Sequence, residues 1–392
     1  MRMLVYSPIS LRFGGGFERW ILEVAARLRK LGIQTQILCT ASTMGDRERI
    51  SSEEISDLLS KASARYSEVP FFRFPMFGSN SPIPSVKGLR RVLSEKDYDI
   101  LYFPNAYAFQ DVLISTLKLT RNRPVISGQH AVLLQGSSFH DLYVNTVTKH
   151  LLGTFDAYHV LNSDDLRIFK GWGLGRTYLI PIGVDIHKFR SRTYDGTQRR
   201  FKVLFVGRMN LQKGVDVMCQ SIRIINQDQS LQRRVQFQIV GSGPMSQMID
   251  ELRKQYLNIQ YLAHVSDEKL PTIYRDSDVL VMPSRSETFG IVAIEAQASG
   301  LPVIATNIPG PREILVDGIT GRLIRSNDPI ALASAIRDFH DLWSKDYEKF
   351  EKMRYNSRIN AEKRFDWEVI ISQIHDMILE TYGSFERKHG KG

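Results

Sequence analysis

The sequence predicts an α/β fold, doubly wound, made of two Rossmann-like halves with parallel sheets. Short β-rich runs alternate with amphipathic helical segments along most of the 392 residues, and this alternation is typical of parallel strands joined by right-handed crossovers. Several of the runs are hydrophobic throughout, as expected of strands that are covered on both faces. The chain length corresponds to two or three domains of about 150 residues each.

The pattern of apolar residues predicts the position of each helix and strand. An amphipathic helix is expected over 17–31, where apolar residues recur at helical spacing. From about residue 330 the pattern is helical only, ending in a C-terminal helix expected over 366–385. The expected strands are 3–6, 35–39, 100–103, 125–127, 157–161, 178–180, 202–206, 236–240, 259–262, 279–282 and 303–305.

A linker is expected within 189–201. The stretch RSRTYDGTQRR there is polar, lacks periodicity and precedes a new strand. The sequence therefore predicts an N-terminal domain over 1–190, closed by the C-terminal helix, and a second domain over 200–365.

Composition narrows the class of protein. Cys39 and Cys219 are isolated, which excludes a disulfide framework and any CxxC-type metal or redox site. No apolar run approaches the roughly 18 residues of a spanning helix, and the first residues lack the pattern of a signal peptide. We therefore expect a cytoplasmic protein.

The formal charge of +10 favours anionic partners. Residues 1–196 hold 25 Lys+Arg and 18 Asp+Glu, or +7 of that surplus. The charges are dispersed, without a zinc-finger, RRM-like or basic-zipper pattern, so nucleic acid is not an expected partner. Two interpretations stay open: a mildly basic solvated surface, or peripheral contact of FFRFPMF (71–77) and of Lys87, Arg90 and Arg91 with an anionic inner-membrane surface.

Three glycine-rich loops follow predicted strands, which is where doubly wound sheets bind ligands. Gly14-Gly15-Gly16 precedes a helix N-terminus that can bind an anion, or is a flexible turn. VGSGPM (240–245) keeps only half of a dinucleotide fingerprint and supports NAD weakly.

The third loop, FVGRMNLQKGVD, carries two cations at a strand end. Arg208 supplies a planar fork and Lys213 a point charge, which together suit a diphosphate. Two exposed surface cations are the alternative.

Two glutamates lie eight positions apart in PSRSETFGIVAIEAQASGLPVIAT (283–306). Glu287 is expected before a helix, where it either fixes sugar hydroxyls or stabilises the helix N-terminus. Glu295 is expected within that helix among apolar residues, where it needs a partner. A ribose diol and a buried salt bridge are both open.

This block resembles the retaining GT-B glycosyltransferases of family 4, the group 1 glycosyltransferases. The resemblance rests on the spacing of Glu287 and Glu295 with Phe289-Gly290 between them. DSDVLVMPS, ASGLPVIATNIPGPREIL, FVGRMNLQKG, VGSGP and IPIGVDIHKF match in order as well. The match is strong over about 200–325 and looser before residue 180.

The resemblance implies a GT-B fold: two Rossmann-like domains facing a cleft, with a C-terminal crossover helix. It also implies transfer of a sugar, with retention, from a UDP- or GDP-sugar to a glycan, a lipid-linked sugar or a small glycoside. A nucleotide-sugar epimerase and a non-catalytic nucleotide-sugar-binding subunit are the alternatives.

The resemblance also implies roles for individual residues. Arg208 and Lys213 would stabilise the diphosphate, Glu287 would position the donor sugar, and His130 in VISGQHAVL would be the active-site histidine. The donor-binding residues would be Gly15, Gly16, Gly207, Gly241, His264, Phe289, Gly290 and Glu295, the last of these on the ribose. His264 stands where the family has glycine, so it either contacts the base or faces solvent.

Two acid pairs have the form of metal-binding DxD motifs. Asp97/Asp99 and Asp276/Asp278 both precede predicted strands, where the family has structural acids. We therefore expect neither a metal nor a cofactor, the nucleotide-sugar being a substrate.

Overall fold

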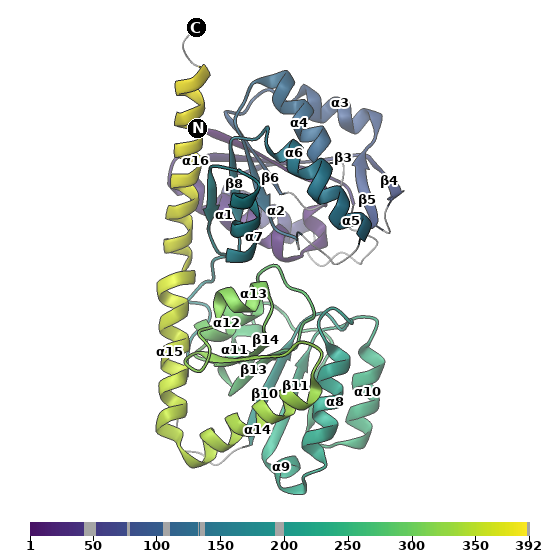
Figure 1. Ribbon diagram of the computed structural model, residues 1–392, viewed down its shortest axis with the longest axis vertical. Helices are drawn as coiled ribbons and strands as arrows, with labels where there is room; N and C mark the ends of the chain where they lie inside the picture. Colours follow the sequence, from purple (N-terminus) through teal and green to yellow (C-terminus); the bar gives the residue numbers. More distant parts are fainter. Residues whose placement is uncertain are drawn as a thin grey trace. The chain divides into compact units, whose positions relative to one another are not determined.

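The computed structural model describes residues 1–42, 52–76, 79–104, 110–131, 133, 138–192 and 200–389. The chain forms two compact units (Figure 1). The first unit contains Met1–Pro181 and Ile370–Gly392, and the second contains Ile182–Val369. The predicted linker region follows Ile182 in the chain, and its residues 193–199 lie outside the described part.

The first unit is built on a parallel sheet. Its strands are β1 (Arg2–Ser7), β2 (Gln34–Thr40), β3 (Arg65–Val69), β6 (Ile100–Pro104), β7 (Val125–Gln129), β8 (Ala157–Val160) and β9 (Thr177–Leu179). Within the described residues the order is β3-β2-β1-β6-β7-β8-β9. Val5 of β1 pairs with Ile37 on one side and Tyr102 on the other, so the topological switch point lies between β1 and β6.

Helices cover this sheet. They are η1 (Leu11–Phe13), α1 (Gly16–Lys30), α2 (Ser52–Ala62), α3 (Val86–Ser94), α4 (Gln110–Arg121), α5 (Ser138–Tyr143), the π-helix η2 (Val144–Thr148), α6 (Lys149–Leu152) and α7 (Ser163–Gly171). The expected helix over 17–31 is α1. Its apolar stripe is buried as the periodicity predicts, including Trp20, Val24 and Leu28. An antiparallel hairpin, β4 (Phe71–Met76) and β5 (Ser79–Pro84), is added to this unit.

The second unit repeats the same topology. Its strands are β10 (Phe201–Val206), β11 (Val235–Val240), β12 (Ile259–Leu262), β13 (Val279–Met282), β14 (Val303–Thr306) and β15 (Gly321–Ile324). They form a parallel sheet in the order β12-β11-β10-β13-β14-β15. β10 pairs with both β11 and β13, so the switch point lies between β10 and β13. Ligands of doubly wound sheets bind beyond the strand ends at such a point.

The helices of the second unit are α8 (Val215–Asn226), α9 (Gln229–Arg234), α10 (Ser246–Gln255), α11 (Leu270–Arg275), α12 (Ile291–Ala298), α13 (Pro309–Ile314), α14 (Pro329–Lys345) and α15 (Tyr347–Phe365). One apolar core lies between the sheet and helices such as α8 and α14, with Phe201, Ile222 and Ile336 fully buried in it.

The final helix, α16 (Trp367–His389), begins in the second unit and belongs to the first unit from Ile370 onward. Within the first unit, Glu380 Oε2 accepts a hydrogen bond of 2.7 Å from the hydroxyl of Tyr178. The ammonium of Lys118 lies 5.3 Å from the ring centre of Phe385. The predicted C-terminal helix is therefore present, and it is longer than expected.

The doubly wound α/β class is confirmed, and every strand expected from the sequence is present. β3, the hairpin and β15 are not among the strands expected from the sequence. β3 and β15 are edge strands. The residues of β3 are mostly polar and partly exposed, and β15 begins with a glycine, so neither shows the uniformly apolar run that marks a central strand.

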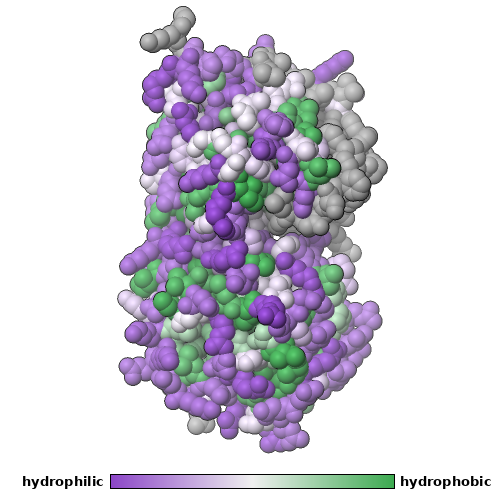
Figure 2. All heavy atoms as spheres, viewed as in Figure 1, coloured by the Kyte–Doolittle hydropathy of each residue, from purple (hydrophilic) through white to green (hydrophobic). Residues whose placement is uncertain are grey.

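Figure 2 shows hydrophilic residues scattered across the visible face of each unit, interrupted by small apolar areas. Lys87, Arg90 and Arg91 are exposed. Of the segment 71–77 that we considered for membrane contact, residue 77 and the side chains of 72–76 lie outside the described part. None of the described helices is both long enough and apolar enough to span a membrane.

Candidate functional site

Two glycine-rich loops meet backbone to backbone at the carboxyl edge of the second sheet. The amide of Gly207, which follows β10, donates to the carbonyl of Val240 at 3.0 Å. Gly241, which follows β11, has φ +126°, and a Cβ there would lie 2.0 Å from the carbonyl oxygen of Gly207. Only glycine fits this position. The structure thus brings the predicted Gly207 and Gly241 together beside the switch point.

Lys213 and Glu287 form an ion pair across the same edge. Lys213 Nζ lies 2.5 Å from Glu287 Oε1, and the hydroxyl of Ser284 donates to that oxygen at 2.9 Å. The two side chains are 28% and 10% exposed. Glu287 Oε2 makes no hydrogen bond with any described residue. One carboxylate oxygen is therefore fixed while the other can accept from a ligand.

An ion pair that the sequence analysis missed holds these two loops in place. Arg285 donates from both guanidinium nitrogens to Asp216, at 2.7 Å each, and also to the carbonyl of Leu211 at 2.7 Å. The hydrogen bonds from Arg285 hold the pKa of Asp216 below its ordinary value. Because Arg285 precedes Glu287 by two residues and Leu211 precedes Lys213 by two, this clamp fixes the register in which that pair meets.

Glu295 lies on α12, as predicted, and its observed partner is a tyrosine. The hydroxyl of Tyr274, from α11, donates to Glu295 Oε2 at 2.7 Å. Burial, and then the neighbouring Glu295, raise the pKa of Tyr274 well above its ordinary value, so its hydroxyl stays a donor. Glu295 is only half-buried and can also accept from a ligand.

Phe289 and Gly290 shape the start of α12. The side chain of Phe289 is buried, with its ring centre 5.9 Å from that of Phe365, so it belongs to the core and only its backbone can serve a ligand. Gly290 caps the helix with φ +110°. A Cβ on Gly310 would lie 2.4 Å from the carbonyl oxygen of Phe289, so the chain approaches closely here as well.

The remaining predicted residues of the second unit are Arg208 and His264. Arg208 is half-buried directly after Gly207. His264 is exposed beyond the edge strand β12 and makes no hydrogen bond with a described residue.

Each acid pair lies at the amino edge of its sheet, opposite the carboxyl edge that carries the predicted site residues. Asp99, just before β6, accepts from the backbone N–H of Arg2 at 2.7 Å. Asp278, just before β13, accepts from that of Lys202 at 2.8 Å and pairs with Arg192 at 2.6 Å. Each acid therefore ties the start of one strand to the start of the central strand in its unit.

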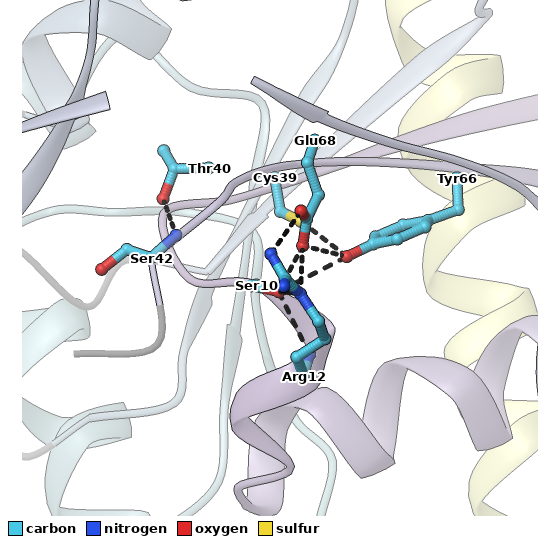
Figure 3. Close-up of polar contacts among 7 residues, drawn as sticks. All are labelled: Ser10, Arg12, Cys39, Thr40, Ser42, Tyr66 and Glu68. Atoms are coloured by element: carbon cyan, nitrogen blue, oxygen red, sulfur yellow. Dashed lines mark hydrogen bonds and ion pairs between the residues drawn. The ribbon is translucent and has the colours of Figure 1, made fainter. Parts of the chain in front are cut away.

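In the first unit, polar side chains anchor the loop that leads to Gly15 and Gly16. Figure 3 shows Ser10, Arg12 and Tyr66 converging on Glu68. Arg12 Nη2 donates to Glu68 Oε2 at 2.7 Å and the Tyr66 hydroxyl donates to Oε1 at 2.6 Å. Burial raises the pKa of Glu68, but the hydrogen bonds from Ser10, Tyr66 and Arg12 outweigh it and lower the pKa overall.

The two glycines lie at the N-terminus of α1. Gly15 is the N-cap residue and Gly16 opens the helix. A Cβ on Gly15 would lie 2.7 Å from a carboxylate oxygen of Glu18. Larger residues at this position would therefore disturb the first turn of α1.

His130 follows β7 at the carboxyl edge of the first sheet. Its Nε2 lies 2.7 Å from the hydroxyl of Tyr102, which in turn lies 2.7 Å from Nδ1 of His159. Burial, together with the neighbouring His159, holds the pKa of His130 well below its ordinary value. Of these three residues the sequence predicts only His130, and no motif in it indicates Tyr102 or His159.

A hollow of about 410 Å³ in the first unit is located elsewhere. Its lining residues include Asp156 and Arg176, which directly precede β8 and β9, so it lies at the amino edge of the sheet. None of the predicted site residues, all of which are described, line it. The candidate site is therefore made of the strand-end loops and not of this hollow.

Two families of known proteins match this chain. The family described as glycosyl transferases group 1 matches residues 191–359, and the family described as Glycosyltransferase Family 4 matches residues 14–188. D-inositol 3-phosphate glycosyltransferase of Geodermatophilus obscurus is 35% identical over 178 residues, which are 41% of this chain and 40% of that relative's length. The match thus spans less than half of that relative.

Two further similarities extend over almost the whole chain. Phosphatidyl-myo-inositol mannosyltransferase of Mycobacterium tuberculosis is 26% identical over 98% of this chain and 98% of its own length. The structure of Anabaena HepE in complex with UDP-glucose superposes with a TM-score of 0.73, at 19% identity, over 96% of this chain and 99% of that chain. With both families matched in order on two doubly wound parallel-sheet units, the chain belongs to the group 1 glycosyltransferases, family 4, and has the GT-B fold.

Proposed function

We propose that this glycosyltransferase moves a sugar from a UDP- or GDP-sugar to a glycan, a lipid-linked sugar or a small glycoside, with retention of anomeric configuration and without a metal ion. One observation carries the proposal. The Lys213–Glu287 pair lies at the switch point of the second sheet, where ligands of doubly wound sheets bind, beside the backbone contact between the loops at Gly207 and Gly241.

The charges of these residues suit the bond that must break. When the bond between the anomeric carbon and the diphosphate oxygen breaks, the electron pair leaves with the nucleoside diphosphate. The acceptor hydroxyl oxygen forms the new bond to the anomeric carbon, and its proton passes to the departing diphosphate oxygen. Negative charge grows on the leaving phosphate, and the pre-placed cations of Arg208 and Lys213 stabilise it as it develops.

The carboxylates would bind the rest of the donor. Glu287, with the backbone of Phe289 and Gly290, would hold hydroxyls of the transferred sugar through its second oxygen. Glu295 would accept hydrogen bonds from the ribose diol, its orientation being fixed by the hydroxyl of Tyr274. His264 would lie beside the base, while Gly15, Gly16 and His130 of the first unit would serve the phosphates and the reacting sugar.

The relatives support a nucleotide-sugar donor. HepE was solved with UDP-glucose, and the mycobacterial relative is named a mannosyltransferase. Neither name determines the base, the sugar or the acceptor of this chain.

A donor screen tests the proposal. Purified protein is incubated with UDP- and GDP-sugars, first in thermal-shift assays and then with candidate acceptors, and products are identified by mass. We expect one donor to stabilise the protein and to yield a glycoside with the anomeric configuration of the donor, read by NMR. Binding without any chemistry would favour a binding subunit, and epimerised donor in the absence of acceptor would favour an epimerase.

The same assay tests whether turnover requires a metal ion. We expect full turnover after extensive dialysis against chelator. Loss of turnover that Mg²⁺ or Mn²⁺ restores would contradict metal independence while leaving the transferase proposal intact.

A further inference from the structure

His130 is one end of a chain of three hydrogen bonds in the first unit. The chain runs from His130 Nε2 to the hydroxyl of Tyr102, then to His159 Nδ1, and from His159 Nε2 to the carbonyl of Ile180. Each of the three contacts is 2.7 Å. Tyr102 and His159 are almost completely buried, so water cannot supply alternative partners.

The carbonyl at the far end determines which atom donates and which accepts in each of these hydrogen bonds. The oxygen of Ile180 can only accept, so His159 carries its proton on Nε2. A neutral His159 then has a lone pair on Nδ1, and the hydroxyl of Tyr102 must donate to it. With its proton committed there, the Tyr102 oxygen accepts from His130, so His130 carries its proton on Nε2.

Burial keeps the side chains of His159 and Tyr102 uncharged. The pKa of His159 is lowered to about 4, chiefly by burial, and burial raises the pKa of Tyr102 well above its ordinary value. Both groups are therefore neutral near pH 7, as the proton assignment requires.

Neighbouring residues pack closely around His130 and Tyr102. The ring centres of Phe17 and Trp20 lie 4.8 and 4.6 Å from that of His130. A Cβ on Gly128 would lie 2.0 Å from the Tyr102 hydroxyl oxygen, so glycine is required for the tyrosine to reach both histidines. The aromatic packing fixes the plane of the His130 ring.

We propose that Tyr102 and His159 are positioning residues that hold His130 in its neutral Nε2–H form, so that Nδ1 offers a lone pair to a substrate hydroxyl. That this hydroxyl group belongs to the donor sugar or to the acceptor rests on the proposed transferase function. The assignment of the protons on His130, Tyr102 and His159 does not depend on that function. His130 Nδ1 makes no hydrogen bond with a described residue, and the residue is half-buried, so this nitrogen is the one left for a ligand.

The tautomer matters because the two forms of histidine have opposite preferences at Nδ1. In the Nε2–H form, Nδ1 accepts a hydrogen bond from a hydroxyl group and makes its oxygen more electron-rich. In the Nδ1–H form, the ring would instead donate to that oxygen. The buried pair therefore decides which interaction the site offers.

Nitrogen-15 NMR of histidine tests the assignment directly. In protein labelled with ¹⁵N-histidine at pH 7.5, His130 and His159 are assigned by comparison with His130→Gln and His159→Gln spectra. We expect both rings to be neutral and protonated on Nε2. In Tyr102→Phe we expect His130 to become a mixture of tautomers, because its proton acceptor is gone. Tyr158→Phe removes another buried hydroxyl of this unit, one bonded to the carbonyl of Leu152, and should leave the His130 signals unchanged.

Kinetics provide the second measurement. Tyr102→Phe should lower kcat/KM for transfer by about tenfold, the value of one lost hydrogen bond, while binding of the nucleoside diphosphate alone stays within twofold. A wild-type His130 protonated on Nδ1 would overturn the proposal, as would an unchanged tautomer in Tyr102→Phe. The wild-type spectrum is decisive even where Tyr102→Phe fails to fold. A chain without transferase activity but with the expected spectrum would overturn the proposed function and leave the proton assignment standing.

Discussion

Lys213 and Glu287 are 74 positions apart in the chain, yet Lys213 Nζ lies 2.5 Å from Glu287 Oε1. The cation belongs to the loop after β10 and the carboxylate to the loop after β13, and these strands are neighbours at the switch point. The ion pair therefore joins the residue proposed for the diphosphate to the residue proposed for the transferred sugar. A donor bound here would contact both members of one preformed pair.

The first prediction concerns the two cations. Lys213→Ala and Arg208→Ala should each lower the transfer rate by roughly 10²–10³-fold, the usual loss when one charge-stabilising group is removed. Steady-state kinetics with the donor identified by the screen would measure this. Lys254→Ala, which removes an exposed lysine of α10, is the matched control and should keep full activity. Near-normal rates in both site variants would contradict the diphosphate assignment.

The second prediction is that Lys213 and Glu287 act as a unit. Because each partner stabilises the other, Lys213→Ala and Glu287→Gln should not have additive effects on kcat/KM. We expect the double variant to be at least tenfold more active than the product of the two single effects predicts. Strict additivity would mean that the pair does not survive in the working enzyme.

The third prediction separates binding from chemistry at Glu295. Tyr274→Phe removes the hydroxyl that orients Glu295 Oε2, so it should raise KM for the donor severalfold and change kcat little, because the ribose takes no part in bond breaking. Tyr355→Phe alters an exposed tyrosine of α15 and serves as control. A fall in kcat at unchanged KM would place Glu295 at the reacting sugar instead.

The fourth prediction concerns backbone packing. Gly241→Ala should lower the free energy of unfolding by about 2 kcal/mol or more, because φ +126° is unfavourable for alanine and its Cβ would meet the carbonyl of Gly207. Gly171→Ala, at a position with nothing within 4 Å and no positive φ, should cost little. Chemical denaturation of both variants would decide it, and equal stability would disprove the close approach of the two loops.

The fifth prediction is a pH dependence of stability. Burial lowers the pKa of His159 to about 4, from the 6.5 of an ordinary histidine. The unfolded chain thus binds a proton between these values that the folded chain does not, and the contribution of His159 to stability is lost as pH falls through this window. The slope is at most about 1.4 kcal/mol per pH unit for one group.

Other buried groups modify this slope. His130 acts in the same direction, whereas burial raises the pKa of Asp165 to about 6 and so favours the folded state as pH falls. Burial also lowers the pKa of His340, which acts in the same direction as His159. Because three histidines oppose one aspartate, we expect urea unfolding to require less denaturant at pH 5 than at pH 7. A His159 ring that titrates near pH 6.5 by NMR would contradict the prediction.

The sequence was sufficient where a pattern is local. The uniformly apolar runs predicted the central strands because such strands are buried on both faces. Gly207 and Gly241 were expected at strand ends because each lies in a glycine-rich loop directly after an apolar run. Glu295 was expected inside a helix because apolar residues surround it at helical spacing, and it lies in α12.

Partners distant in the chain could not be predicted in this way. Nothing in the sequence around Arg285 indicates that it clamps Asp216, or around Tyr274 that it meets Glu295. Tyr102 and His159 each occupy an apolar strand and have the appearance of core residues. Which strands neighbour each other depends on the whole fold, so these contacts follow only from the assembled sheet.

The two-segment composition of the first unit has a consequence for biosynthesis. The second unit is one continuous stretch of chain, so it is synthesised between the two segments of the first unit. The first unit lacks α16 until the second unit has been made, although Ile374, Met377 and Ile378 of that helix are buried. Its hydrophobic surface therefore stays partly uncovered while the second unit is being made, and the unit made first is the one completed last.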